Sequence, residues 1–354
     1  MAKIQVAVLG ATGMIGQRFV QLLEDHPWFE IGGLYASERS EGKRLADVMK
    51  VKDHVFKEET LERRIEQLDA KAVAKRCRVA FSGLPSDIAK DIETSLSEEG
   101  VAVFSNAASH RMRPDVPLLI PEVNPDHLDL IKKQKCYKDG GYIVTNANCS
   151  TTGLALPLKA ILEAFGLKFV CVSTYQAISG AGYPGVPSLD IMANIVPFIK
   201  NEEEKMEEEI FKMLGKKTAK GIEMPKFDMV ASCARVPVID GHTESVVIKM
   251  DKEASVDEVV KVLTKFRPAP QRLGLPTAPL RPIIVRMEEN RPQPLCDVYA
   301  GEPSRARGMA VTVGRVRQSG NKYTKLWLLS HNTLRGGAGG SVLNAELARA
   351  KKLL

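Results

Sequence analysis

The chain has 354 residues, of which 44% are hydrophobic and 26% charged, a composition typical of globular proteins with sizeable cores. Its 50 basic and 43 acidic residues leave a formal net charge of +7, and the two signs are interspersed without a dense basic block, which argues against nucleic-acid binding. The lack of an apolar run of about 18 residues and of a signal-peptide pattern predicts a cytoplasmic protein with no membrane partner.

The spacing of cysteines and histidines argues against a disulfide framework and against a metal site. The cysteines form no C-x-x-C pair, and the six histidines form no H-x-x-x-H pair, so we expect reduced thiols and no metal site. The mild positive excess suits anionic small-molecule ligands, although it serves solubility equally well. The six cysteines are Cys77, Cys136, Cys149, Cys171, Cys233 and Cys296.

The first half of the chain alternates strand-like and helix-like segments. Strands are predicted at residues 3–9, 29–37, 78–86, 101–109 and 141–150, and helices at 17–26 and 87–100. Such alternation predicts an α/β fold with a parallel, doubly wound sheet. We expect this first domain to span residues 1–150.

The second half has strands with longer gaps and fewer helices between them. Strands are predicted at residues 167–180, 245–250, 283–287, 309–317 and 325–331. This pattern predicts an α+β domain with a mixed sheet over residues 151–331. Residues 197–217 predict a helix whose acidic run is most simply a solvated face, and a helix within 332–354 is expected to return to the first domain.

A glycine-rich turn follows the first predicted strand. Gly10, Gly13 and Gly16 form G-x-x-G-x-x-G at the head of a helix, where backbone N–H groups and the helix N-terminus favour a phosphate. The pattern departs from G-x-G-x-x-G, and glycine turns between strands and helices are common. Its place at the first strand–helix junction favours a dinucleotide site.

The end of the second strand discriminates between NAD and NADP. NAD enzymes usually place a carboxylate there to bind the ribose hydroxyls, whereas Ser37, Arg39 and Ser40, followed by Lys43, offer hydroxyls and cations. These groups suit a 2′-phosphate, so we predict NADP as the cofactor. A solvated loop without a ligand is the alternative interpretation, and Glu38 is expected to point outward.

The segment "NANCSTTGLALP" places Cys149 just before a predicted helix. A helix N-terminus favours the thiolate form of cysteine, and Ser150, Thr151 and Thr152 are good helix-capping types. Asn148 and the first backbone N–H groups of the helix are suited to bind an oxyanion. Cys149 is therefore a candidate nucleophile, although a buried cysteine that only fills space is an equally good interpretation of this segment alone.

A base for this thiol has to come from elsewhere in the chain. His242 follows the turn Asp240–Gly241, and Arg235 lies seven residues earlier across a short strand-like stretch. One pair of strands would bring this imidazole and guanidinium into the same cleft. The alternative interpretation is a solvated histidine on a turn, without a catalytic role.

Six motifs in chain order together resemble one family. They are "LGATGMIGQRFV", "SNAASHRM", "NANCSTTG", "QAISGAGYPGVPS", "RVPVIDGH" and "HNTLRGGAGGSV", and the family is aspartate-β-semialdehyde dehydrogenase, in its archaeal and fungal branch. The resemblance implies NADPH-dependent reduction of L-4-aspartyl phosphate to L-aspartate 4-semialdehyde, a step toward lysine, threonine and methionine. It also implies a Rossmann domain for NADP, a catalytic and dimerisation domain, and a homodimer or homotetramer.

The resemblance also assigns roles to residues around the substrate. Cys149 is implied to carry the acyl thioester, His242 to act as acid/base and Gln176 to orient the substrate, with Asn148 beside them. The substrate-binding residues implied are Arg235 for the α-carboxylate, Arg111 and Lys205 for the phosphate, and Glu202 or a neighbour for the amine.

Cofactor contacts follow from the same likeness. Residues of the glycine turn are implied to bind the pyrophosphate, and others the nicotinamide. The predicted cofactor-binding residues are Gly10, Thr12, Gly13, Met14, Ile15, Ser37, Arg39, Ser40, Ser82, Ser179, Gly180, Gly182 and Asn332.

Other functions stay open on the same residues. A malonyl-CoA reductase would use a CoA thioester on this scaffold, and N-acetylglutamyl-phosphate reductase is a more distant relative with the same cysteine–histidine chemistry. A non-catalytic NADP-binding sensor would bind the cofactor without turnover. A cysteine–histidine hydrolase would leave the dinucleotide turn without a purpose.

Overall fold

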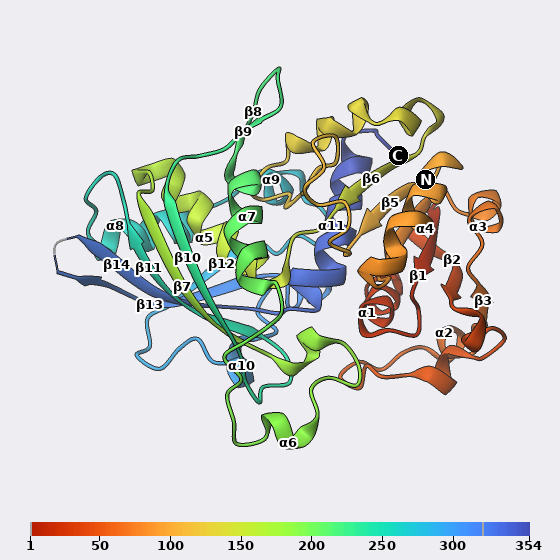
Figure 1. Ribbon diagram of the computed structural model, residues 1–354, viewed down its shortest axis with the longest axis horizontal. Coiled ribbons are helices and arrows are strands. Elements are labelled where there is room, and N and C mark those ends of the chain that lie inside the picture. The colour runs from red at the N-terminus through yellow and green to blue at the C-terminus, as the bar shows by residue number, and fades with distance from the viewer. Residues whose placement is uncertain (1, 321) are drawn as a thin grey trace. The chain divides into compact units, whose positions relative to one another are not determined.

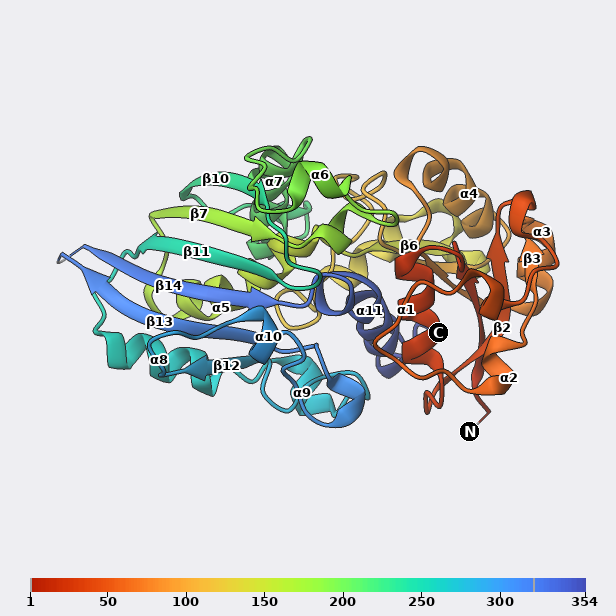
Figure 2. The same ribbon diagram turned by 90° about the horizontal axis from the view of Figure 1, so that it is seen from below.

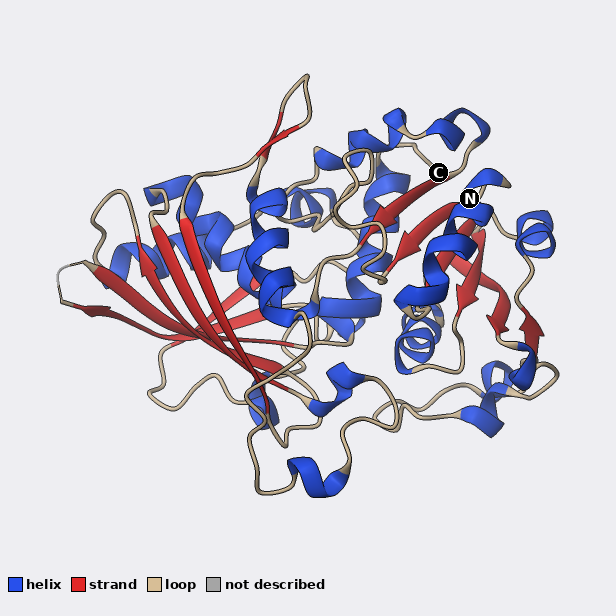
Figure 3. Ribbon diagram, viewed as in Figure 1, coloured by secondary structure: helices blue, strands red, loops and turns tan. Residues whose placement is uncertain are grey.

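The computed structural model describes residues 2–320 and 322–354 and divides them into two compact units. The first unit holds the residues up to Leu119, Asp126–Ala147 and Gly337–Leu354, and the second holds Ile120–Pro125 and Asn148–Gly336. The predicted domain boundaries lie at residues 150 and 332, whereas the units change at 147/148 and 336/337. Figure 1 labels the elements, and Figure 3 separates helices from strands by colour.

The first unit contains a six-stranded sheet in which every pair of neighbours is parallel. The strand order is β3-β2-β1-β4-β5-β6. This order steps outward in both directions from β1, as in a doubly wound sheet, and confirms the predicted α/β class. The strands are β1 Ile4–Leu9, β2 Phe29–Ala36, β3 Ile65–Gln67, β4 Val79–Ser82, β5 Ala102–Ser105 and β6 Tyr142–Thr145.

Helices pack on both faces of this sheet, because right-handed crossovers that step in opposite directions place their helices on opposite sides. α1 packs against α11, and α3 packs against α4. Phe19, Phe29, Phe81 and Phe104 form the aromatic centre of the core. The helices are α1 Met14–Leu23, α2 Glu58–Leu61, α3 Ala70–Arg76, α4 Ser86–Glu98 and α11 Gly339–Ala350.

The last helix, α11, is buried within the first unit from Gly339 to Ala348. Its Glu346 carboxylate lies 2.9 Å from His26 Nε2, and both side chains are fully buried. The Asn106 amide donates to Ser341 Oγ, and the Arg349 guanidinium lies over the Trp28 ring. The final segment of the chain therefore supplies core that the first 147 residues lack.

The second unit contains a mixed sheet in the order β10-β7-β11-β14-β13-β12, which Figure 2 shows from one edge to the other. β10 is parallel to β7, the three central pairs are antiparallel, and β12 is parallel to β13. This arrangement confirms the prediction of a mixed sheet. The strands are β7 Phe169–Gln176, β10 Asp228–Arg235, β11 His242–Lys249, β12 Ile283–Arg286, β13 Val311–Ser319 and β14 Tyr323–Ser330.

One face of this sheet is covered by α5, α7 and α8. Alternate residues of β11 are buried from His242 to Ile248, and the residues between them are only half-buried, as expected for a sheet covered on one face. The helices of the unit are α5 Cys149–Phe165, α6 Ser188–Ile191, α7 Glu202–Leu214, α8 Val256–Lys265, α9 Ala269–Leu273 and α10 Pro294–Asp297. A two-stranded ribbon, β8 Lys216–Lys217 and β9 Ile222–Glu223, follows α7.

The predicted helix at 197–217 is shorter in the structure. α7 begins only at Glu202, because Asn201 has a left-handed φ of 57° and cannot continue a helix, and it ends before Gly215. Along the described residues, no helix combines the length and the apolar character that a membrane span requires.

Candidate active site

The register of the second sheet brings three predicted residues together at one edge. β7 and β10 run parallel, so Gln176 and Arg235 pair at their ends. β11 runs antiparallel to β7 with Thr243 opposite Tyr175, so His242 comes level with Gln176. All three side chains are at least nine-tenths buried. We call Arg235, Gln176 and His242 the first row.

Cys149 is the first residue of α5, as the sequence predicted for a thiol at a helix N-terminus. The cap is Asn148, however, and not the Ser150–Thr152 segment. Asn148 Oδ1 accepts from the backbone N–H groups of Ser150 and Thr151 at 2.9 and 3.0 Å, which places those residues inside the helix. Gly336 lies against the thiol residue, because a Cβ atom there would come within 2.7 Å of Cys149 Cβ.

Cys149 and His242 are in direct contact, with 3.2 Å between Sγ and Nε2. His242 Nδ1 accepts from the Ala177 backbone N–H at 3.1 Å, so the ring proton sits on Nε2 and points at the sulfur. Complete burial, with contributions from the positive charge of Arg235 and from His331, lowers the pKa of His242 to about 3. The imidazole is therefore neutral and acts as a hydrogen-bond donor toward the thiol position.

Glu202, at the start of α7, joins the first row to the head of α5. Its Oε1 accepts from Asn148 Nδ2 at 2.9 Å and from Gln176 Nε2 at 3.0 Å. We call these three residues the Glu202 network. One amide N–H of Asn148 is thereby bound to Glu202, which leaves the other N–H for the oxyanion role predicted for it.

Glu209 is a residue of the site that sequence reasoning missed. Its Oε2 accepts from the Asn148 backbone N–H at 2.7 Å, and only 2% of the residue is exposed. The acidic run was interpreted as a solvated face, yet Glu202 and Glu209 are both buried. Their spacing of seven residues, two helical turns, was the signal that these two carboxylates share one face of α7.

Lys205 lies one turn after Glu202 on the same side of α7 and is half-buried. The Arg235 guanidinium donates to the Ala177 carbonyl at 2.8 Å, and its burial lowers the pKa of this group. Both cations therefore belong to the second unit and are candidates for anionic parts of a ligand.

The predicted nicotinamide contacts of the second unit also lie beside the first row. A Cβ atom at Gly180 would come within 2.8 Å of Arg235 Nη1 and 3.0 Å of His242 Cε1, so a larger residue there would displace these two side chains. Asn332 Nδ2 donates to Ser179 Oγ at 2.8 Å, and Asn332 Oδ1 accepts from the Gly241 N–H at 2.8 Å. Gly182 follows on the same loop with a φ of 74°.

In the first unit, the glycine turn joins β1 to α1. Gly13 N donates to Gly10 O at 2.9 Å, and a Cβ atom at Gly16 would lie 2.1 Å from Gly10 O. Gly10 has a φ of 75°, which favours glycine. The turn is thus a tight glycine turn at the N-terminus of α1, a position that suits a pyrophosphate. The predicted residues Thr12, Met14 and Ile15 belong to the same segment.

The other predicted cofactor residues of this unit share the carboxyl edge of the sheet. Ser82 ends β4 opposite Leu9 of β1 and is buried. Ser37 and Arg39 are exposed directly after β2, and Ser40 is half-buried. The edge that carries the glycine turn therefore also carries these hydroxyls and this cation.

Arg111 lies in the first unit, in the loop after β5. It is 8% exposed, and its Nη2 donates to the Asn106 carbonyl at 2.8 Å. Asn106 directly follows β5, so this arginine also belongs to the carboxyl edge of the parallel sheet.

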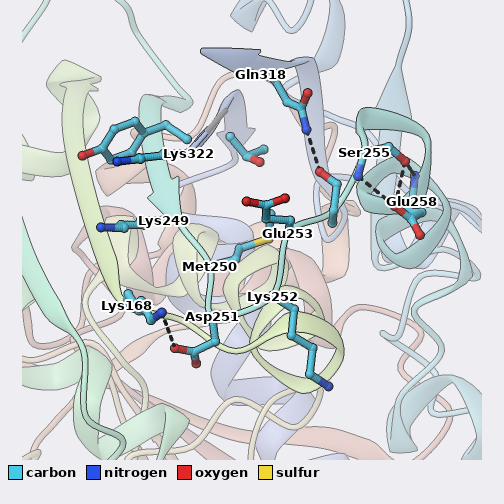
Figure 4. Close-up of a pocket in the computed structure, with 13 residues that line it drawn as sticks. Lys168, Lys249, Met250, Asp251, Lys252, Glu253, Ser255, Glu258, Gln318 and Lys322 are labelled. Atoms are coloured by element: carbon cyan, nitrogen blue, oxygen red, sulfur yellow. Dashed lines mark hydrogen bonds and ion pairs between the residues drawn. The ribbon is translucent and has the colours of Figure 1, made fainter. Parts of the chain in front are cut away.

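A pocket of about 570 Å³ lies at the other end of the second sheet from the first row. It is lined by the start of β7 and β14 and by the end of β11 and β13, with Lys168, Lys249, Lys252 and Lys322 around it. Figure 4 shows that carboxylates, such as Asp251 near Lys168, are interspersed with these lysines. It contains none of the predicted site residues, so the candidate active site remains the one at the first row.

Comparisons with known proteins agree with this geometry. The family model "Semialdehyde dehydrogenase, NAD binding domain" matches residues 5–131, and "Semialdehyde dehydrogenase, dimerisation domain" matches residues 158–335. The aspartate-semialdehyde dehydrogenase of Archaeoglobus fulgidus is 48% identical over 99% of this chain and 100% of its own length. That of Schizosaccharomyces pombe is 44% identical over 100% of both chains.

A solved structure extends the likeness to the fold. The aspartate semialdehyde dehydrogenase of Candida albicans, crystallised with NADP, has a TM-score of 0.89 and 39% identity, with 100% of both chains covered. The likeness in sequence and structure runs the whole length of the chain. This chain belongs to the semialdehyde dehydrogenase family.

Proposed function

We propose that the protein is an NADP-dependent aspartate-semialdehyde dehydrogenase. It reduces L-4-aspartyl phosphate to L-aspartate 4-semialdehyde and releases phosphate, a step in the biosynthesis of lysine, threonine and methionine. The observation that carries this proposal is the 3.2 Å contact of Cys149 Sγ with His242 Nε2 at the head of α5. The full-length relatives that bear this enzyme's name support it.

Cys149 is the nucleophile in this proposal. The N-terminus of α5 and the Nε2–H of His242 both stabilise a thiolate at this position. The thiolate attacks the acyl carbon of aspartyl phosphate, a carbon–sulfur bond forms, and the carbon–oxygen bond to phosphate breaks. The product on the protein is a thioester, which divides one difficult reaction into two steps.

The remaining steps need a reductant and a hydrogen-bond donor that stabilises the negative charge on the former carbonyl oxygen. NADPH, when bound, supplies the hydride that reduces the thioester to the aldehyde level. Collapse of the resulting thiohemiacetal anion releases the aldehyde and returns the thiolate, so no proton has to be transferred. A neutral His242 with its proton on Nε2 is suited to hold this oxyanion or thiolate by a hydrogen bond. The acid/base role predicted for it requires Nε2 to exchange that proton.

The charged groups fit the parts of this substrate. Arg235 offers a planar fork for the α-carboxylate, Glu202 offers a carboxylate for the amine, and Lys205 and Arg111 offer cations for the phosphate. Gln176, fixed by Glu202, is placed to orient the acyl group. These roles follow from the family resemblance and from the charge and burial of each group.

NADP is the cofactor that the residues suit. The Gly10–Gly16 turn is too tight for a side chain at Gly16, whose Cβ atom would lie 2.1 Å from Gly10 O, and such a tight glycine turn at the head of α1 fits a pyrophosphate. Ser37, Arg39 and Ser40 suit the 2′-phosphate, and the structural neighbour from Candida albicans was crystallised with NADP. The remaining predicted contacts are Thr12, Gly13, Met14, Ile15, Ser82, Ser179, Gly180, Gly182 and Asn332.

The test is an assay of NADPH formation from aspartate semialdehyde and NADP with and without phosphate. We expect turnover that depends on phosphate, because phosphate must cleave the Cys149 thioester in this direction. Malonyl-CoA with NADPH is the parallel assay. Turnover with malonyl-CoA alone would replace this proposal with a malonyl-CoA reductase, and cofactor binding without any turnover would favour a sensor.

We also propose a homodimer or homotetramer in the cytoplasm. The face of the second sheet away from α5 and α7 carries half-buried residues, among them the stacked rings of Tyr175 and Trp327 at 5.6 Å. The family model for this region is described as a dimerisation domain. Light scattering of the purified protein tests the oligomer.

A further inference from the structure

A second buried row lies directly beneath the first row on the same face of the second sheet. The sheet register places Cys233 of β10, Thr174 of β7, Glu244 of β11 and Leu328 of β14 side by side. Each residue of this second row lies two positions from a residue of the first row or its β14 neighbour, so the side chains share one face. Glu244 is thus a carboxyl group one layer below His242.

Nothing in the described surroundings compensates a charge on Glu244. The residue is 0% exposed, and neither carboxyl oxygen has a hydrogen-bond partner among the described residues. An ionised carboxylate buried without partners is strongly disfavoured. Burial, reinforced by the negative charge of Glu202, raises the pKa of Glu244 well above its usual range.

The other groups that face this layer do not change that conclusion. His242 is neutral, and burial raises the pKa of the Cys233 thiol to about 12. The Arg235 guanidinium lies in the first row and donates to the Ala177 carbonyl. Of the titratable groups on α5 and α7, Glu202 is the one that acts on the pKa of Glu244, and the buried Lys212 lies almost three helical turns further along α7. β14 contributes the apolar Leu328.

We propose that Glu244 is a neutral carboxylic acid and a positioning residue, whose lack of charge keeps the Glu202 network in place beneath the reacting groups. Ionisation of Glu244 would set two carboxylates against each other in a buried layer. The more exposed Glu202 would then move, and Gln176 and Asn148 would lose their common acceptor. This inference rests on the proposed function, because it assigns those two amides to substrate orientation and the oxyanion.

Infrared difference spectroscopy measures the charge state directly. A spectrum of the wild-type protein minus that of Glu244→Gln at neutral pH should contain the carbonyl stretch of a protonated carboxyl group. Glu93→Gln, which removes a buried acid of the first unit, is the matched control and should leave that band in place. Absence of the band in the wild type at neutral pH would overturn the inference.

A pair of identical substitutions then tests the positioning role. Glu202→Gln removes a charged acceptor of two N–H groups and should lower kcat/KM about 10²-fold. Glu244→Gln replaces one neutral polar group with another and should stay within about threefold of wild type, a small free-energy change. An equal loss of kcat/KM in both variants would show that Glu244 acts as an ionised carboxylate, and would overturn the inference.

The pH dependence links the two measurements. Wherever rising pH removes the infrared band, wild-type kcat should fall while that of Glu244→Gln does not. Loss of the band with unchanged wild-type kcat would refute the positioning role. A wild-type protein that shows the band but has no semialdehyde turnover would contradict the proposed function instead, so the two failures are distinguishable.

Discussion

Each unit has predicted site residues at one edge of its sheet, and the two edges are built differently. We call the edge with the glycine turn the first edge and the edge with Cys149 and the first row the second edge. In the first unit, the glycine turn is a single run from Gly10 to Gly16 that closes on itself, and its Gly10 N–H donates to the Tyr35 carbonyl of the neighbouring strand at 2.8 Å. In the second unit, Cys149, Gln176, Glu202, Arg235 and His242 come from five different elements. The first edge is therefore a local structure that a motif specifies, whereas the second exists only once the sheet register is set. Substitutions in the two edges should have separable effects.

The largest effect is expected from Cys149→Ala in the second edge. The variant loses the nucleophile, so phosphate-dependent NADPH formation should fall by about 10⁴-fold or more. NADP affinity, measured by fluorescence titration, should stay at the wild-type value because Cys149 is not among the predicted cofactor contacts. A large loss of NADP affinity in this variant would contradict the expectation that substitutions in the two edges have separable effects.

The next effect is expected from Gly16→Ala in the first edge. A Cβ atom there would lie 2.1 Å from Gly10 O, so the turn has to open, at a cost that corresponds to about a 10²-fold loss of NADP affinity. Gly13→Ala is the graded control, since its Cβ atom would lie 3.3 Å from the same oxygen. We expect the smaller loss from Gly13→Ala, and the reverse order would contradict the steric account.

Glu93 of α4 allows a comparison of buried acids in the two units. It accepts from Ser105 Oγ at 2.7 Å, and burial raises its pKa to about 7. The folded state therefore binds a proton that the unfolded state releases above pH about 4.5, so the stability contributed by this proton falls as pH rises from about 4.5 to 7.

Glu93→Gln cannot ionise and should lack this fall. Between pH 5 and pH 8, urea unfolding should show the wild type losing about 2 kcal/mol more stability than the variant. An identical change with pH in both proteins would show that folding does not raise the pKa of Glu93.

The smallest effect is expected from Arg39→Ser at the end of β2. An exposed cation contributes about 1 kcal/mol to the binding of an anion such as the 2′-phosphate. The preference for NADP over NAD should therefore fall about fivefold. The ratio of kcat/KM for the two cofactors measures this. Lys43→Ser, on the same exposed loop, is the comparison variant, and an equal effect there would show a diffuse field instead of a specific contact.

The sequence predicted the local features of both edges and the convergence of Arg235 with His242, but it missed the inward face of α7 and the surroundings of Glu244. The glycine turn and the helix start at Cys149 depend on neighbours in the chain, so their residues specify them. Asn148 was not recognised as the cap, because Ser150 and Thr151 are equally good capping types and only the backbone angles decide. The family resemblance supplied the site residues of the second unit, which spacing alone left open.

Two features of the second unit could not be predicted from the sequence, for physical reasons. The acidic run of α7 permits several registers, and only its packing against α5 shows that Glu202 and Glu209 face inward. Strand alternation places Glu244 on the same face as His242. Whether a buried carboxyl has a partner depends on side chains from other strands and helices, which no local pattern contains.

The position of α11 has a consequence for how the protein is made. All six strands of the parallel sheet have been translated once residue 145 emerges, yet the buried residues Gly339–Ala348 that complete the core of the first unit come almost 200 residues later. The second unit ends at Gly336 and so is fully synthesised first. During translation the apolar surface that α11 covers, near Trp28 and Phe104, stays open to solvent. We therefore expect the nascent chain to need chaperone protection until α11 leaves the ribosome.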